Sequence, residues 1–117
     1  MAGQTSVTIK VISNKIPELP AALRAQVVEQ VKRSTLDVQA RAQQVVPVRT
    51  GTLRRSIHSI FEQGGLKGIC GPSVDYGLPV EMGSRGRAAR PYMRPAAEYV
   101  LPRFADELRR ILGGLKP

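Results

Sequence analysis

The residues that could carry out catalysis are few. His58 is the only histidine of this 117-residue sequence, and Cys70 is its only cysteine. A general base needs a placed nucleophile and an orienting acid, but the nearest acid to His58 in the sequence is Glu62. Asp75 and Glu81 could pair as carboxylates, yet nothing beside them completes a hydrolytic site. We therefore expect a surface or packing histidine, a buried thiol and no enzymatic activity.

The sequence contains few residues that could bind a metal ion or a cofactor. A structural zinc site needs four Cys or His ligands, and the chain offers two. The glycines at 64, 65, 68 and 71 match neither the dinucleotide-binding fingerprint nor the Walker motif. We expect no metal site and no cofactor. No apolar run approaches the roughly 20 residues that span a membrane, so no membrane partner is expected.

Positive charge is the strongest chemical signal. The sequence has 18 Lys and Arg residues against 9 Asp and Glu, which gives a formal charge of +9. Residues 83–94 include four arginines, two glycines and a proline but no acid, so we expect a long basic loop. Such a loop could bind nucleic-acid phosphates without reading sequence, or pair with acids of a partner protein. Composition leaves both possibilities open. The four arginines are Arg85, Arg87, Arg90 and Arg94.

Hydrophobic periodicity in the first half predicts a strand and a long helix. Residues 5–12 alternate, with Val7, Ile9 and Val11 on one face, which is typical of a half-buried strand. From about residue 20 to residue 46, apolar side chains recur at steps of three and four, which predicts an amphipathic helix of about 25 residues. Pro47 should end this helix because proline disfavours helical geometry at the preceding residue. The apolar stripe comprises Leu23, Val27, Val31, Thr35, Val38, Ala42 and Val45.

The second half predicts a hairpin and a second helix. Residues 48–52 read as a turn and 53–61 as a strand, and Gly64-Gly65 should turn the chain into a partner strand at 66–70. Residues 76–82 read as one or two helical turns. Pro95 suits a helix start, and Pro102 should kink or interrupt that helix near Tyr99. Its apolar face comprises Ala96, Tyr99, Val100, Phe104, Leu108, Ile111 and Leu112.

Together these elements predict an α+β fold. A small antiparallel β-sheet packs against the long helix of the N-terminal half, with a C-terminal helix and a long basic loop at about residues 83–94. A chain of this length has room for one core. Residues 1–117 are therefore expected to form a single domain.

Three segments resemble a known family. Residues 47–57 read PVRTGTLRRSI and resemble the segment P-V-x-T-G-x-L-x-x-S-I of the head–tail joining, or tail-completion, proteins of long-tailed phages and prophages. Residues 76–84 read YGLPVEMGS and resemble the Y-A-x-x-V-E-F-G-T segment of that family. Residues 90–96 read RPYMRPA and resemble its x-P-F-M-R-P-A segment, which opens the last helix. The resemblance covers about residues 20 to 115.

This resemblance implies a structural protein of the virion neck, assembled in the host cytoplasm. Such proteins are similar to one another in forming rings, commonly sixfold, around an axial channel. The implied partners are further copies of the chain as a ring, the adaptor or stopper proteins of the head connector, tail terminator or tail-tube proteins, and double-stranded DNA passing through the channel. DNA that slides through a ring should meet electrostatic contacts without base readout.

Residue roles follow as hypotheses from the matching segments. Thr50 and Gly51 should build a tight turn, with Gly51 at positive φ. Pro91, Met93 and Pro95 should fix the exit of the basic loop and pack its end. Glu81 is a candidate to pair with an arginine of the loop or of a neighbouring subunit. The four loop arginines, Arg85 and Arg87 first among them, should face the DNA channel or a partner. Further motif residues are Leu53, Tyr76 and Gly83.

A second function remains compatible with the sequence. A small basic domain could bind DNA non-specifically through phosphate contacts without forming a ring. Assembly separates the two hypotheses, because a ring former should give discrete oligomers or assemble with tail proteins. A simple DNA-binding domain should stay small and bind with a steep dependence on salt.

Overall fold

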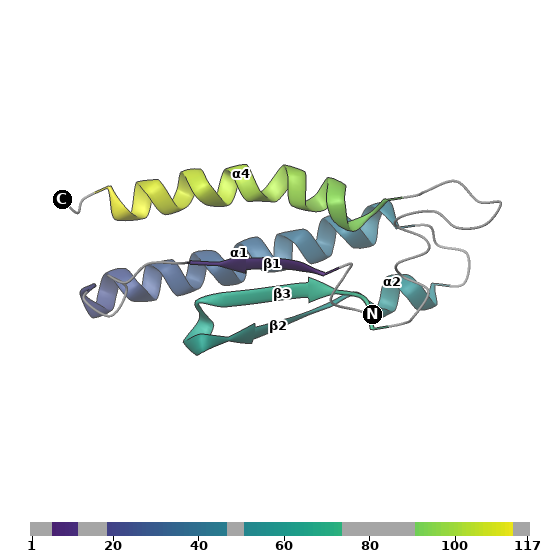
Figure 1. Ribbon diagram of the computed structural model, residues 1–117, viewed down its shortest axis with the longest axis horizontal. Helices are drawn as coiled ribbons and strands as arrows, with labels where there is room; N and C mark the ends of the chain where they lie inside the picture. Colours follow the sequence, from purple (N-terminus) through teal and green to yellow (C-terminus); the bar gives the residue numbers. More distant parts are fainter. Residues whose placement is uncertain (1–5, 12–18, 47–50, 74–90, 114–117) are drawn as a thin grey trace.

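The computed structural model is elongated, with principal extents of 54 × 21 × 20 Å. It describes residues 6–11, 19–46, 51–73 and 91–113. The described elements follow the order β1, α1, α2, β2, η3, β3 and α4 along the chain (Figure 1). They make up a three-stranded antiparallel sheet with two long helices, so the predicted α+β class is confirmed.

The sheet is built from β1 (Val7–Lys10), β2 (His58–Glu62) and β3 (Lys67–Gly71) in the order β1-β3-β2. Both pairings are antiparallel, and the predicted hairpin joins β2 to β3. Its connection is a short 3-10 turn, η3 (Gln63–Gly65), in which Gly64 and Gly65 have φ of 66° and 94°. Glycine adopts these left-handed angles without the steric cost that a Cβ brings.

The long helix α1 (Ala21–Val45) lies over the sheet (Figure 1). Its predicted stripe is buried through most of its length, from Val27 through Val31, Thr35 and Val38 to Ala42. The stripe prediction is wrong at Val45, which is half exposed, while Val46 is buried at the helix end. Val46 has extended backbone angles, as expected before Pro47, and this turn of the chain directs Val46 inward.

The C-terminal helix α4 (Met93–Leu112) runs antiparallel to α1 and also reaches the edge strand β1 (Figure 1). Side chains from the sheet and both helices share one core, which includes Ile9, Val38, Cys70, Val100 and Phe104. The helix begins two residues earlier than expected, so Met93 and Arg94 belong to it and not to the basic loop. Residues 74–90, which include positions 83–90 of that loop and the predicted helical turns at 76–82, lie outside the described residues.

Two further expectations are wrong. Residues 53–56 form most of a short helix, α2 (Thr52–Ser56), and not the start of a strand. Leu53 and Ile57 are both buried, and their spacing of four fits a helix as well as a strand, which is why periodicity misplaced this segment. Pro102 was expected to kink or interrupt this helix, and the interruption is wrong because α4 is one continuous helix. The kink stays a prediction. Pro102 and Glu98, whose carbonyl loses its helical partner, are both exposed, which limits the cost of the missing hydrogen bond.

Candidate interaction surfaces

One end of the molecule carries several of the sequence motifs. Gly51 caps the N-terminus of α2 with φ of 80°, as expected for the turn, and Leu53 of α2 is buried in the core. Gln43 of α1 donates its side-chain N–H groups to the carbonyls of Arg54 and Ile57, at 3.4 and 3.3 Å. These contacts attach α2 to α1. Figure 1 places α2 at the same end as the first turn of α4.

Arginines gather at this end. Arg54 and Arg55 on α2 and Arg94 on α4 are exposed. Ser73, whose hydroxyl lies 3.5 Å from the carbonyl oxygen of Ser56, also lies beside α2. Ser73 and Pro91 flank residues 74–90, which contain Arg85, Arg87 and Arg90. This arginine-rich segment therefore begins and finishes at the end of the molecule that carries Arg54, Arg55 and Arg94, the basic end. Of the four arginines assigned to the loop from the sequence, Arg94 is the one within the described residues, and it belongs to α4.

The remaining predicted site residues divide into two groups. Met93 is buried in the core, with Tyr92 beside it fully buried, while Pro91 and Pro95 are half buried. Met93 thus packs in the core, while the role of Pro91, Met93 and Pro95 in fixing the exit of the basic loop stays a prediction. The other group lies outside the described residues and comprises Thr50, Tyr76, Glu81, Gly83, Arg85, Arg87 and Arg90.

The residues considered for catalysis do not meet. His58 is exposed on β2, and its Nδ1 lies 2.9 Å from the carbonyl oxygen of Ser56. Cys70 is fully buried on the opposite face of the sheet, which it shares with Ser59. Burial raises the pKa of the Cys70 thiol to about 11 despite an opposing hydrogen bond from Ser59. A thiol with this pKa is a poor nucleophile at neutral pH.

Across residues 6–11, 19–46, 51–73 and 91–113, no three His, Cys, Asp or Glu side chains cluster as metal ligands would. None of the helices described there is both long and apolar enough to cross a bilayer.

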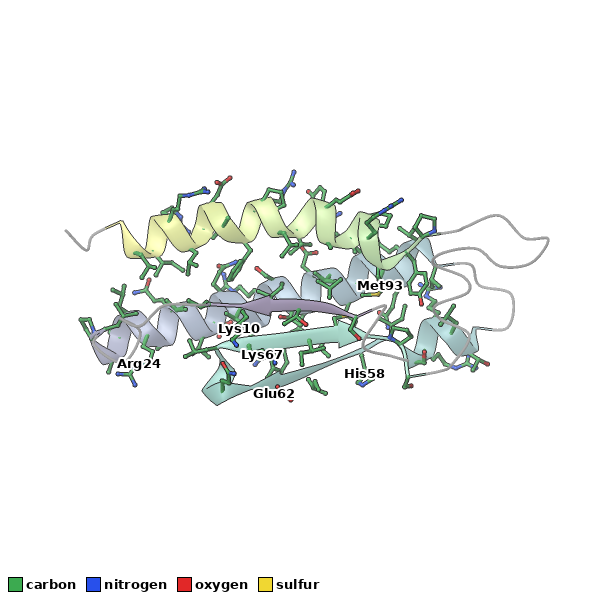
Figure 2. The ribbon with its side chains drawn as sticks, in the orientation of Figure 1. Lys10, Arg24, His58, Glu62, Lys67 and Met93 are labelled. Atoms are coloured by element: carbon green, nitrogen blue, oxygen red, sulfur yellow. The ribbon has the colours of Figure 1, made fainter. Side chains whose placement is uncertain are left out.

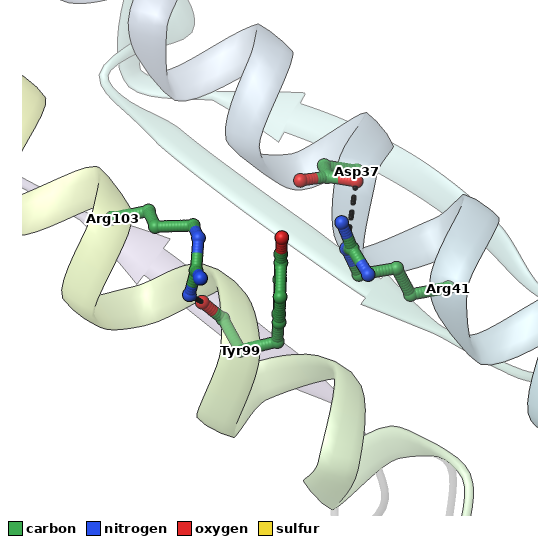
Figure 3. A network of polar contacts seen from close by, with 4 residues as sticks. All are labelled: Asp37, Arg41, Tyr99 and Arg103. Atoms are coloured by element: carbon green, nitrogen blue, oxygen red, sulfur yellow. Dashed lines mark hydrogen bonds and ion pairs between the residues drawn. The ribbon is translucent and has the colours of Figure 1, made fainter.

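A second polar surface lies between α1 and α4. Tyr99 of α4 is 38% exposed, although the sequence placed it on the apolar face of the helix. Arg41 of α1 stacks on one face of its ring and Arg103 of α4 on the other, with guanidinium carbons 3.3 and 3.6 Å from the ring centroid (Figure 3). Asp37 accepts a hydrogen bond from Arg41 Nε at 3.2 Å. The two i, i+4 pairs, Asp37 with Arg41 and Tyr99 with Arg103, were the only sequence signal for this cluster.

The outer face of the sheet carries a smaller charged row. Lys10, Lys67 and Glu62 lie side by side on β1, β3 and β2 (Figure 2). Lys67 pairs with Glu62 at 3.5 Å. Exposed pairs of this kind contribute little to stability, so we assign this row no functional role.

Comparison with known families adds a finding that geometry alone does not supply. A model of the family described as "Bacteriophage HK97-gp10, putative tail-component" matches residues 10–83. The match extends over more than half of the chain and includes α1, α2 and the β2–β3 hairpin. No curated protein and no solved structure matches the chain.

Proposed function

Because the chain belongs to the HK97-gp10-like family of phage tail components, we propose that it is a structural protein of the phage neck that joins the head connector to the tail. As a tail component it is a virion protein and works in contact with other virion proteins. The family match is the observation that carries this proposal. The resemblance of residues 47–57, 76–84 and 90–96 to tail-completion proteins supports the neck as the position within the particle.

We propose further that the protein acts as a homo-oligomeric ring, a hexamer, around the DNA channel. The basic end of the molecule supports this arrangement, because Arg54, Arg55 and Arg94 lie where the arginine-rich residues 74–90 join the described structure. Guanidinium groups at a channel wall would neutralise phosphates without reading bases, so DNA could slide past. In this proposal Arg85, Arg87, Arg90 and Arg94 face the channel or a neighbouring subunit, and Glu81 pairs with one of them.

A phage carrying an early stop codon in this gene tests the proposal. If the protein joins head to tail, electron microscopy of the lysate should show full-length tails and separate heads, and a plasmid copy of the gene should restore joined particles. If heads and tails are still joined in the absence of the protein, the neck position is contradicted. Arrest of tail-tube growth before joining would place the protein in the tail body instead.

Non-specific DNA binding without a ring is the second candidate, and the charge of +9 favours it. The two functions differ in solution. A ring former mixed with tail proteins gives discrete large species, whereas a simple DNA-binding domain stays small and loses affinity steeply as salt rises. Mass measurement with and without tail proteins distinguishes them.

A further inference from the structure

The Tyr99 ring is contacted on both faces although it lies at the surface. Arg41 and Arg103 cover the two faces of the Tyr99 ring, and Arg103 Nη1 also donates to the Tyr99 carbonyl oxygen at 2.8 Å (Figure 3). Side chains that are already ordered lose little entropy when a partner binds. Tyrosine and arginine are also among the residue types enriched at the energetic centres of protein interfaces.

Arg103 carries the charge that this surface leaves unmatched. Asp37 pairs with Arg41, Glu29 pairs with Arg33, and Glu107 pairs with Arg110. No carboxylate of the described residues forms an ion pair with Arg103. A planar guanidinium with free N–H donors is suited to bind a carboxylate through two parallel hydrogen bonds.

A recess beside Arg103 gives an incoming side chain a place to sit. It has a volume of about 110 Å³ and lies between α1 and α4, with Val100 and Phe104 among its apolar lining. Its charged walls bear both signs, with Arg33 and Arg103 opposed by Asp37 and Glu107. Asp37 and Glu107 are each paired with an arginine of their own helix, which leaves Arg103 for a single incoming carboxylate. The closely spaced phosphates of a nucleic acid could not reach Arg103 without also approaching these two acidic groups. The recess therefore suits a protein partner better than DNA.

We propose that the Tyr99 cluster and this recess form a docking surface for an acidic segment of a different virion protein, which places an Asp or Glu carboxylate on Arg103. A second copy of the chain is the poorer occupant of this surface, because five of the six carboxylates in the described residues already form ion pairs within the chain. The inference rests on the virion role of the family and is independent of ring formation.

The Tyr99 cluster lies outside the buried core. The apolar side chains that join α1 to α4 and the sheet, such as Val31, Val38, Val100 and Phe104, are buried in clusters that do not include Tyr99 or Arg103. Substitutions of Tyr99 and Arg103 should therefore leave a folded protein in which docking can be measured.

Photo-crosslinking in particles tests the proposal. The photoreactive residue p-benzoylphenylalanine replaces Tyr99 in the full chain, phage particles are irradiated, and mass spectrometry identifies the crosslinked peptide. We expect a crosslink to a different virion protein, within a few residues of an Asp or Glu. The same probe at Leu101, which is exposed but lies about 200° around the helix from Tyr99, should not give this crosslink. Crosslinks from position 99 only within the chain, to a second copy or to DNA would overturn the proposal.

A charge series at Arg103 decides the question if the probe itself blocks assembly. Arg103→Glu should reduce the yield of infectious particles about tenfold or more, because it sets two carboxylates against each other. Arg103→Lys should keep most of the yield, since the positive charge remains. Arg109→Glu makes the same charge change at another exposed position of α4 and should have little effect. Equal losses for Arg103→Glu and Arg109→Glu, or a matching fall in melting temperature for Arg103→Glu alone, would overturn the proposal.

Failure of this inference and failure of the neck proposal give different results. Heads and tails that join without the protein would refute the neck position, yet the Tyr99 crosslink to a virion protein would still be seen. Loss of joining in the stop-codon phage, with no crosslink from position 99, would refute the docking surface alone.

Discussion

At Gly68 the sheet packs tightly against Thr35 of α1. A Cβ at this position would lie 2.0 Å from Thr35 Oγ1 and 2.9 Å from Thr35 Cβ. We expect Gly68→Ala to lower the free energy of unfolding by about 1–3 kcal/mol, because the helix or the strand must move to admit the methyl group. Urea titration followed by circular dichroism measures this change.

A second substitution separates this close contact from general effects of losing a glycine. Thr35→Ala removes Oγ1 and Cγ2, so it should recover part of the stability lost in Gly68→Ala. It should not rescue Gly64→Ala, which meets no atom within 4 Å and reports only the strain of a positive φ. Independent, additive effects of Gly68→Ala and Thr35→Ala would contradict the close packing.

Cys70 makes stability depend on pH in the alkaline range. Burial raises the pKa of its thiol from 9.0 to about 11, so the folded state holds the proton more tightly than the unfolded state. The stabilisation is complete below pH 9 and is lost as pH rises towards 11. We expect the unfolding free energy to fall over this window more steeply in the natural protein than in Cys70→Ala. Parallel curves for the two proteins would show that the thiol is not responsible.

At the scale of elements, the sequence predicted most of the fold because periodicity and turn residues agree there. A strand is the one structure that fits the alternation of Val7, Ile9 and Val11. A hairpin turn is the one that fits the glycines between β2 and β3. Prediction failed where a pattern fits two structures. The spacing of Leu53 and Ile57 fits a helix and a strand equally well. Tyr99 was assigned to the apolar face because the periodicity of one helix carries no information about the guanidinium groups that an adjacent helix supplies.

Proline tests the helix assignment of α4. Pro102 lies inside the helix and is exposed, so it removes a backbone hydrogen bond without supplying core packing. We expect Pro102→Ala to raise the free energy of unfolding by about 1–2 kcal/mol. Pro95→Ala is the matched control and should change little, because the first-turn N–H of a helix has no intrahelical acceptor. Thermal unfolding measures the change in stability of both variants. Equal changes for Pro102→Ala and Pro95→Ala would argue against a continuous helix at Pro102.

At the scale of the whole molecule, the family could be predicted from three short motifs, and the family match confirms it. The Tyr99 cluster could not be predicted, because Arg41 and Tyr99 are brought together only when α4 folds along α1. The predicted contacts of Arg85, Arg87 and Arg90 remain predictions, since they depend on partners outside the chain.

Charge reversal in the arginine-rich segment separates assembly from folding. Arg85→Glu combined with Arg87→Glu should change the unfolding free energy of the isolated protein by no more than about 0.5 kcal/mol, as exposed substitutions usually do. Joined particles or the retention of DNA in them should decrease. A large fall in melting temperature would instead place these arginines in the internal structure of the subunit.

The most direct test of the account is the position of this protein in the assembled particle. A reconstruction of the virion by electron microscopy should show it as one closed sixfold ring at the junction of head and tail, with its arginine-rich end towards the DNA. Copies repeated along the tail tube, or particles whose neck contains none, would contradict the proposal that this chain joins head to tail.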